Sequence, residues 1–415
     1  LRSAARETAK AYGLAKAQLE RLLKALPRRR YHPRYRDRTT KEEVLARLDE
    51  GLLREAASAA YEITGFPHHL SLHAGGLVIT PGPLTDLVPV QWAPKGYLCT
   101  QYDHADVAAV GLPKLDLLGI RALTVLADAA AAVQQHHDPA FRLADLPLDD
   151  AQTGDLLARG DTVGVFQCDS QGARRTLRKL EARTVPDLAV ANAFFKPGPA
   201  TGGQADAFVR RYRGQAEARY LHPALEPILA RTQGVLIFQE QVLRVATEIA
   251  GLSWEEAGAI RRGMSKMDSH AMARLQEAFV AGCRRPAPEG PAFTAEQAAR
   301  LWEQVLAFSG YGFNQGHATA YADVSYRSAY LKTHFPAAFF WARLRNRGGY
   351  HHPAVYMAEA LRVGIDVRPP HVNESEARVR LAWEGEQPVL WLGLGCVRDL
   401  RRRAVTALVR ARQAD

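Results

Sequence analysis

The sequence predicts a multidomain α+β fold in which a few short strands accompany larger helical regions. The chain has 415 residues, too many for one compact core, so we expect about two to four domains. Hydrophobic residues make up 47% of the chain, which is ample for burial. Short strand patterns near residues 75–79 and 114–117 lie among longer stretches with helical periodicity.

The charge and the cysteines indicate a polyanionic partner and a reducing compartment. A net charge of +10 and a pI near 9.5 favour binding to a polyanion, although such a charge can also serve solubility alone. The four scattered cysteines form no C-x-x-C pair, so neither a zinc site nor a disulfide framework is predicted, and we expect a cytoplasmic protein. No apolar run is long enough for a membrane span. The chain starts with Leu1 inside a helical pattern, so we expect it to be part of a longer protein.

The N-terminal region is predicted to be helical and basic. Residues 1–26 have the pattern of a helix pair broken at Gly13, and residues 41–64 form a further helical region. Between them, residues 28–38 hold six arginines and two tyrosines. Arginines interleaved with aromatic residues suit contacts with a nucleic-acid backbone. Arg28, Arg29 and Arg30 are therefore candidates, and a solvated basic loop is the alternative.

Residues 65–109 carry turn and strand signals. Gly75-Gly76 precede an apolar strand at residues 77–79, and a Pro-Gly-Pro turn follows. His73 could be a metal ligand, but we favour a packed structural histidine. Further short strands are expected over residues 88–109, where we interpret Asp103 and Asp106 as structural.

The most informative stretch is residues 111–124, GLPKLDLLGIRALT. Leu115 and Leu117 alternate with Lys114 and Asp116, so the pattern predicts a short strand with one apolar and one charged face. Lys114 and Asp116 would lie about 6–7 Å apart on that charged face. A carboxylate can hold a divalent cation there, and an ammonium can neutralise phosphate oxygens. The alternative is an exposed ion pair without chemistry.

The following region is predicted to be mainly helical, with two basic patches. Asp149 or Asp150 is a candidate N-cap for a helix that reaches Arg159, and residues 164–167 form a buried strand or turn. The patches face either a phosphate backbone or solvent. They comprise Arg174, Arg175, Arg178 and Lys179 on a helix over residues 173–180, and Arg210, Arg211 and Arg213.

Two later stretches place cations and polar groups at helix ends. After a strand-like segment at residues 235–238, a helix starts near Gln239. Ser253 is then the predicted N-cap of a second helix that ends in Arg261 and Arg262, with Lys266 just beyond. Residues 308–336 begin FSGYGFNQGH, and a helix is expected from about Ala318. His317 lies at the N-terminus of that helix, which attracts phosphate; packing against Tyr321 is the alternative.

These stretches, in this order, resemble C-family bacterial DNA polymerases, the polymerase III alpha-subunit family. The resemblance rests on HAGGLVITPGPL, LPKLDLLGIRALTVL, GVFQ, IRRGMSK and YGFNQGHATAYA. It implies that Asp116 is a metal-binding carboxylate and that Lys114, Arg261, Arg262, Lys266 and His317 neutralise triphosphate charge. Tyr311 and Asn314 would shape the nucleotide pocket. The sequence departs from the family at Cys168-Asp169, at Lys196 in place of arginine, and at Gln315-Gly316 in place of Lys-Ser.

The resemblance also implies a domain order. Residues 1–68 would form the thumb, 69–120 the C-terminal part of the palm with a mixed sheet, and 121–345 the large helical fingers. Residues 346–415 would begin the C-terminal helix-hairpin-helix and clamp-binding region, because residues 390–412 resemble the start of a helix-hairpin-helix element.

The implied function is template-directed DNA synthesis with two Mg²⁺ ions, in a replicative or a damage-tolerant branch. The family supplies two further aspartates in a P-D-x-D-x-D stretch that this sequence does not contain, so we expect the 415 residues alone to be inactive. Expected partners are primed template DNA, deoxynucleoside triphosphates, a sliding clamp and other replication or translesion proteins. The alternative is a non-catalytic DNA-binding scaffold or a degenerate polymerase.

Overall fold

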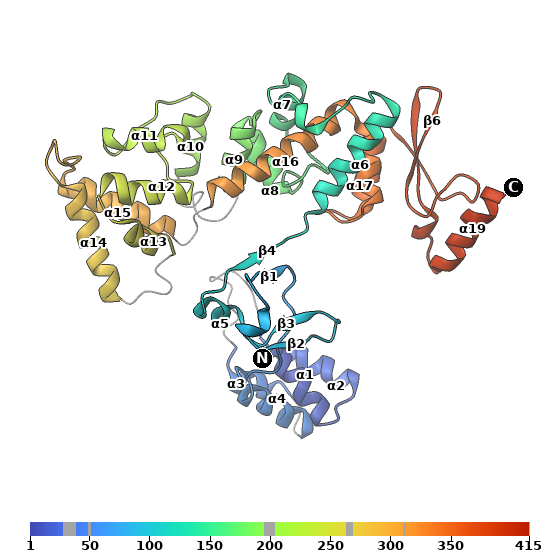
Figure 1. The fold of residues 1–415 in the computed structure, drawn as a ribbon, viewed down its shortest axis with the longest axis horizontal. Coiled ribbons are helices and arrows are strands. Elements are labelled where there is room, and N and C mark those ends of the chain that lie inside the picture. The colour runs from blue at the N-terminus through green and yellow to red at the C-terminus, as the bar shows by residue number, and fades with distance from the viewer. Residues whose placement is uncertain (28–38, 49–50, 195–203, 263–268, 310–312, 415) are drawn as a thin grey trace. The chain divides into compact units, whose positions relative to one another are not determined.

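The chain forms two compact units, residues 1–119 and 120–415, shown in Figure 1. The computed structural model describes residues 1–415 except 28–38, 49–50, 195–203, 263–268, 310–312 and 415. None of the described helices combines the length and the apolar character that crossing a membrane requires. The α+β class predicted from the sequence is confirmed.

Among its described residues, the first unit begins with four helices around one small core. Ala5, Leu22, Val44 and Ala57 are fully buried in that core. The helix pair broken at Gly13 is confirmed, since this glycine has a φ of +66° between the first two helices. The helices are α1 (Arg2–Ala11), α2 (Lys16–Ala25), α3 (Lys41–Ala46) and α4 (Leu52–Glu62).

Two antiparallel strand pairs complete the first unit. β1 (Gly76–Val78) pairs with β4 (Lys114–Asp116), and β2 (Val90–Trp92) pairs with β3 (Leu98–Thr100). Short strands were expected over residues 88–109, but the last part of this region is the helix α5 (His104–Ala109). Asp103 caps this helix by accepting hydrogen bonds from two backbone amides. The described strands of this unit pair only antiparallel, so the mixed sheet expected in the palm segment does not lie among them.

The described residues of the second unit form two hydrophobic cores. Leu157, Tyr326, Phe339 and Phe340 are fully buried in the first core. Of the two candidate N-caps, Asp149 and Asp150, it is Asp150 that caps α7. The helices of this part are α6 (Arg121–His136), α7 (Ala151–Ala158), α8 (Gln171–Leu180), α9 (Val185–Phe194), α10 (Gln204–Tyr212), α16 (Gln315–His334), α17 (Pro336–Arg345) and α18 (Pro353–Arg362).

The second core lies around Val245, Phe279 and Trp302. Helix α12 continues into a π-helical turn, Val245–Ile249. Ser253 accepts a hydrogen bond from the Glu256 amide, which confirms it as a cap. The helices here are α11 (Glu226–Leu229), α12 (Gln239–Arg244), α13 (Trp254–Arg262), α14 (Ser269–Cys283) and α15 (Ala295–Ser309).

The C-terminal part of the second unit holds the mixed sheet. Its strand order is β5-β7-β6, with β5 parallel and β6 antiparallel to β7. The elements are β5 (Asp366–Arg368), β6 (Arg380–Glu384), β7 (Gln387–Trp391) and α19 (Arg402–Ala414).

Candidate functional site

The β1–β4 ribbon carries the acid and the base that the sequence singled out. Its register sets Asp116 opposite Gly76 and Lys114 opposite Val78. The Lys114 ammonium lies 2.8 Å from both carboxylate oxygens of Asp116. The two side chains therefore share a face of the strand, as the alternating pattern predicted.

His73 lies beside this pair, and the expectation that it is packed is wrong. Its side chain is 56% exposed, and its Nδ1 atom lies 3.7 Å from an oxygen of Asp116. The same Nδ1 accepts hydrogen bonds from the backbone amides of Gly75, at 3.2 Å, and Gly76, at 2.6 Å. In the neutral ring the proton is then on Nε2. The signal in the sequence was a histidine spaced two residues before Gly-Gly.

The glycine pair allows this close arrangement. A Cβ atom at Gly75 would lie 2.7 Å from the carbonyl oxygen of Leu117, the residue directly after β4. A Cβ at Gly76 would lie 2.7 Å from His73 Nδ1 and 3.2 Å from Lys114 Cδ. Any larger residue at position 76 would therefore push His73 and Lys114 away from the carboxylate.

Asp116 is held in its ionised form. The hydrogen bond from Lys114 lowers the pKa of this exposed carboxyl, and the charge of Lys114 acts in the same direction. An exposed, ionised carboxylate is a suitable ligand for a hard divalent cation. In the described parts of the chain, however, no three or more His, Cys, Asp or Glu side chains converge as a metal site. Asp116 thus fits a metal ion as one ligand that needs others.

The opposite face of the ribbon is apolar and exposed. Leu77 and Leu115 face each other across the pair, and Leu117 continues the same face next to Gly75. Their exposed fractions are 48%, 45% and 66%. The alternation of the strand is confirmed, but its apolar side is not covered within the described residues.

The predicted nucleotide residue Asn314 is the N-cap of α16. Its side-chain oxygen accepts a hydrogen bond from the His317 amide at 2.6 Å. Its side-chain nitrogen donates to Glu240 at 2.7 Å, and the second Glu240 oxygen accepts from the Gln315 amide at 2.8 Å. The helix starts three residues before the expected Ala318 because this cap satisfies its first amides.

His317 is exposed in the first turn of α16. Its ring centroid lies 4.0 Å from that of Tyr321 and 5.3 Å from that of Phe313. The ring thus contacts Tyr321, as the alternative role expected, and it is also exposed to solvent, as a role in phosphate binding requires. Two nearby α16 amides are already bonded to side-chain oxygens, of Asn314 and Glu240.

The remaining predicted nucleotide residues are described only in part. Arg261 is exposed near the end of α13. The Arg262 side chain, Lys266 and Tyr311 lie outside the described residues, although the backbone of Arg262 ends α13. Their convergence with His317 and with the Lys114–Asp116 pair stays a prediction.

The basic patches are partly engaged in contacts within the protein. Arg174 donates to the Gly160 carbonyl at 2.8 Å, Arg211 donates to Gln233 at 3.4 Å, and Arg213 pairs with Glu181. The Lys179 ammonium lies 3.6 Å from Asp206. Arg175, Arg178 and Arg210 are exposed, whereas Arg28, Arg29 and Arg30 lie outside the described residues. The exposed members remain candidates for backbone phosphate contacts.

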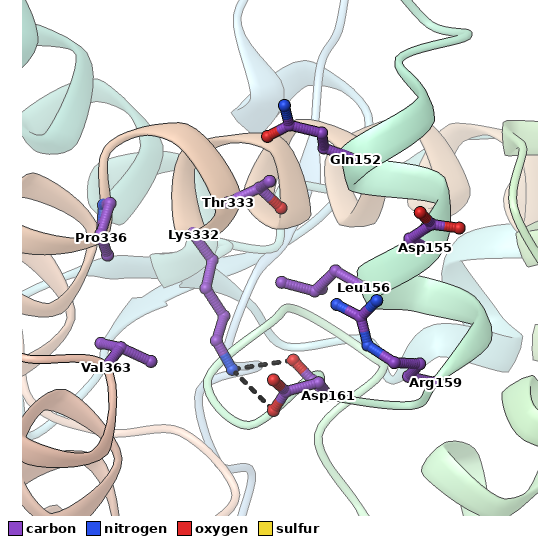
Figure 2. A pocket seen from close by; sticks show the side chains of 9 residues that line it. All are labelled: Gln152, Asp155, Leu156, Arg159, Asp161, Lys332, Thr333, Pro336 and Val363. Carbon is purple, nitrogen blue, oxygen red and sulfur yellow. Dashed lines mark hydrogen bonds and ion pairs between the residues drawn. The ribbon is translucent and has the colours of Figure 1, made fainter.

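A cavity of about 400 Å³ lies elsewhere in the second unit, lined by α7, the end of α16, the start of α17 and Val363 just after α18. Figure 2 shows the side chain of Lys332 pointing to Asp161, with Arg159 next to Asp161. None of the residues predicted from the sequence to act on nucleotide or DNA lines it.

Three family profiles match the chain in sequence order. A bacterial DNA polymerase III alpha NTPase domain matches residues 1–119, the finger domain of that subunit matches 122–286, and a helix-hairpin-helix motif matches 364–415.

Curated relatives match across both units. DNA polymerase III subunit alpha of Thermus aquaticus is 35% identical over 422 residues, which covers 99% of this chain and 34% of that protein. The corresponding subunit of Aquifex aeolicus is 33% identical, covering 87% of this chain and 30% of that protein. An error-prone DNA polymerase of Anaeromyxobacter sp. (strain K) is 36% identical, covering 100% of this chain and 38% of that protein. The chain spans about a third of the length of these relatives.

Proposed function

Since the chain belongs to the family of bacterial DNA polymerase III alpha subunits and error-prone DNA polymerases, we propose that it takes part in template-directed DNA synthesis by nucleotidyl transfer. A primer 3′-hydroxyl would attack the α-phosphate of a deoxynucleoside triphosphate. The new bond joins that oxygen to phosphorus, the bond to the bridging oxygen breaks, and pyrophosphate leaves.

The observation that carries this proposal is the exposed, ionised Asp116 beside Lys114 and His73. Asp116 would be one ligand of Mg²⁺, which supplies Lewis-acid stabilisation of the phosphoryl oxygens when bound. Two-metal chemistry needs further carboxylates, and we propose that they come from outside the described residues. On binding, Lys114 would exchange its bonds to Asp116 for bonds to phosphate oxygens.

The second unit would supply the nucleotide pocket. Arg261, Arg262 and Lys266 would neutralise triphosphate charge, with the exposed ring of His317 on α16 beside them. Tyr311 and Asn314 would shape the pocket, Asn314 through its cap of α16. The exposed basic residues and the helix-hairpin-helix match favour contacts with primed duplex DNA.

Primer extension tests this proposal. In the full-length protein, Asp116→Asn should abolish nucleotide incorporation and leave duplex binding nearly unchanged, because the amide keeps the shape but loses the charge that holds a cation. Asp86→Asn, at an exposed acid of the same unit, is the matched control and should extend primers normally. Near-normal extension by Asp116→Asn would exclude Asp116 as a metal ligand.

A second candidate, a DNA-binding scaffold without chemistry, is favoured by one observation. Glu240 and Asn314 already occupy amides at the N-terminus of α16, where phosphate was expected. A scaffold would bind primed DNA but show no incorporation in the wild-type protein at any Mg²⁺ concentration, whereas a polymerase would extend the primer.

A further inference from the structure

The segment that leads into α12 connects the two cores of the second unit. Phe238 is buried in the first core, whereas Val242, one helical turn later, is buried in the second. The candidate nucleotide residues are divided in the same way. His317 lies on α16, next to Ala318 of the first core, and Arg261 lies on α13, next to Ile260 of the second.

The start of α16 is fastened to this connecting segment by backbone and side-chain bonds. Phe238 and Phe313 form a parallel bridge, and the Gln239 amide donates to the Phe313 carbonyl at 2.9 Å. Glu240, in the first turn of α12, then bonds both Asn314 and the Gln315 amide. These contacts join residues 74 and 75 positions apart in the sequence.

Glu240 is the only side chain among the described residues that is shown bonding across this junction to both the cap of α16 and its first amide. Its carboxylate accepts both bonds, and it adds a negative charge at the positive end of the helix. Asn314 is oriented by the same contact, because its nitrogen is held by Glu240 while its oxygen caps the His317 amide. The first turn of α16, which carries His317, is thus bonded to Glu240 both directly and through Asn314.

We propose that Glu240 is a positioning residue for nucleotide binding, which locks the start of α16 to α12 so that His317 and Arg261 of α13 bind one triphosphate. The proposal rests on the proposed function. Without Glu240 the two cores keep their own packing. The nucleotide-binding residues next to one core are then no longer held in a fixed position relative to those next to the other core. The lost alignment raises the cost of binding the triphosphate.

Single-nucleotide incorporation by the full-length protein tests the proposal. Glu240→Ala should raise KM for the nucleotide roughly tenfold while kcat changes less than about twofold. Glu240→Gln keeps one carbonyl oxygen for the Gln315 amide and should have a smaller effect. Glu248→Ala is the matched control, because Glu248 pairs only at the surface with Arg244 on the same helical stretch.

A double variant makes the test specific to the contact. Combining Glu240→Gln with Asn314→Asp exchanges donor and acceptor across the junction. The carboxylate at position 314 can cap the His317 backbone amide and accept a hydrogen bond from the side-chain NH₂ group at position 240. The side-chain carbonyl oxygen at position 240 still accepts a hydrogen bond from the Gln315 backbone amide. KM should return towards the wild-type value, and Asn314→Asp alone should raise it, because two carboxylates would then face each other.

Hydrogen exchange at the Gln315 amide separates the inference from the proposed function. Faster exchange in Glu240→Ala with KM unchanged would overturn the positioning role, and so would a double variant no better than the two single ones. If Glu240→Ala lowers both kcat and the free energy of unfolding but leaves KM unchanged, the role of Glu240 is only structural. That result would also overturn the positioning role. A wild-type protein without incorporation would instead refute the proposed function.

Discussion

Replacing Glu359 by glutamine should destabilise the second unit and alter its response to acid. The side chain of Glu359 is 10% exposed, and one of its oxygens lies 2.7 Å from the ammonium of Lys332, which is 1% exposed. Its other oxygen accepts from Arg362 at 2.8 Å. The ammonium also donates to the backbone carbonyl of Asp161 at 2.8 Å. These bonds tie α16 to α18.

The magnitude follows from the pKa of Glu359. Burial alone would raise this pKa, but hydrogen bonds from Arg362 and Lys332 outweigh burial and lower it from 4.5 to about 2. At about 1.36 kcal/mol for each pH unit, this difference corresponds to about 3 kcal/mol. Because the folded state has the lower pKa, that stability is fully present above pH 4.5 and is lost as the pH falls towards 2.

Urea unfolding between pH 7 and pH 2, with hydrogen exchange of α18 amides as the local readout, measures this effect. At pH 7, Glu359→Gln should lower the free energy of unfolding by about 3 kcal/mol. The difference from wild type should shrink below pH 4.5. Glu386→Gln, at an exposed acid in the β6–β7 turn, removes the same charge as a control. Parallel stability curves for Glu359→Gln and wild type across this range would refute the reasoning.

Three further predictions concern the ribbon, the C-terminal turn and DNA binding. Gly76→Ala should strongly reduce primer extension by displacing His73 and Lys114, whereas Gly119→Ala, which has open space around it, should not; equal activities would contradict the steric argument. Asp399 has a φ of +63°, so Asp399→Gly should raise the free energy of unfolding by about 0.5–1 kcal/mol. A lower free energy of unfolding in urea denaturation would contradict this prediction. Binding of primed duplex DNA should weaken steeply and without sequence preference between low and moderate salt; a salt-independent affinity in a fluorescence titration would exclude phosphate contacts as its main source.

The sequence by itself determined the local features of the site. The alternation at residues 114–117 predicted that Lys114 and Asp116 share a face, and the structure confirms it. Side-chain caps such as Asp150 and Ser253 were also identified, because a cap bonds amides only two or three positions away. The motifs that resemble the polymerase family belong to the same category, since each is a short contiguous stretch.

Tertiary structure alone decided which groups meet across long separations. His73 reaches Asp116 only because β1 pairs with β4 in one register, and periodicity does not specify the partner of a strand. Glu240 carried no signal in the sequence, yet it fastens the start of α16. Lys332 lies on α16 and Glu359 on α18, and their buried ion pair depends on how both helices pack with α17. Such pairings depend on how whole elements pack, and a local pattern of residues specifies only the face that each element presents.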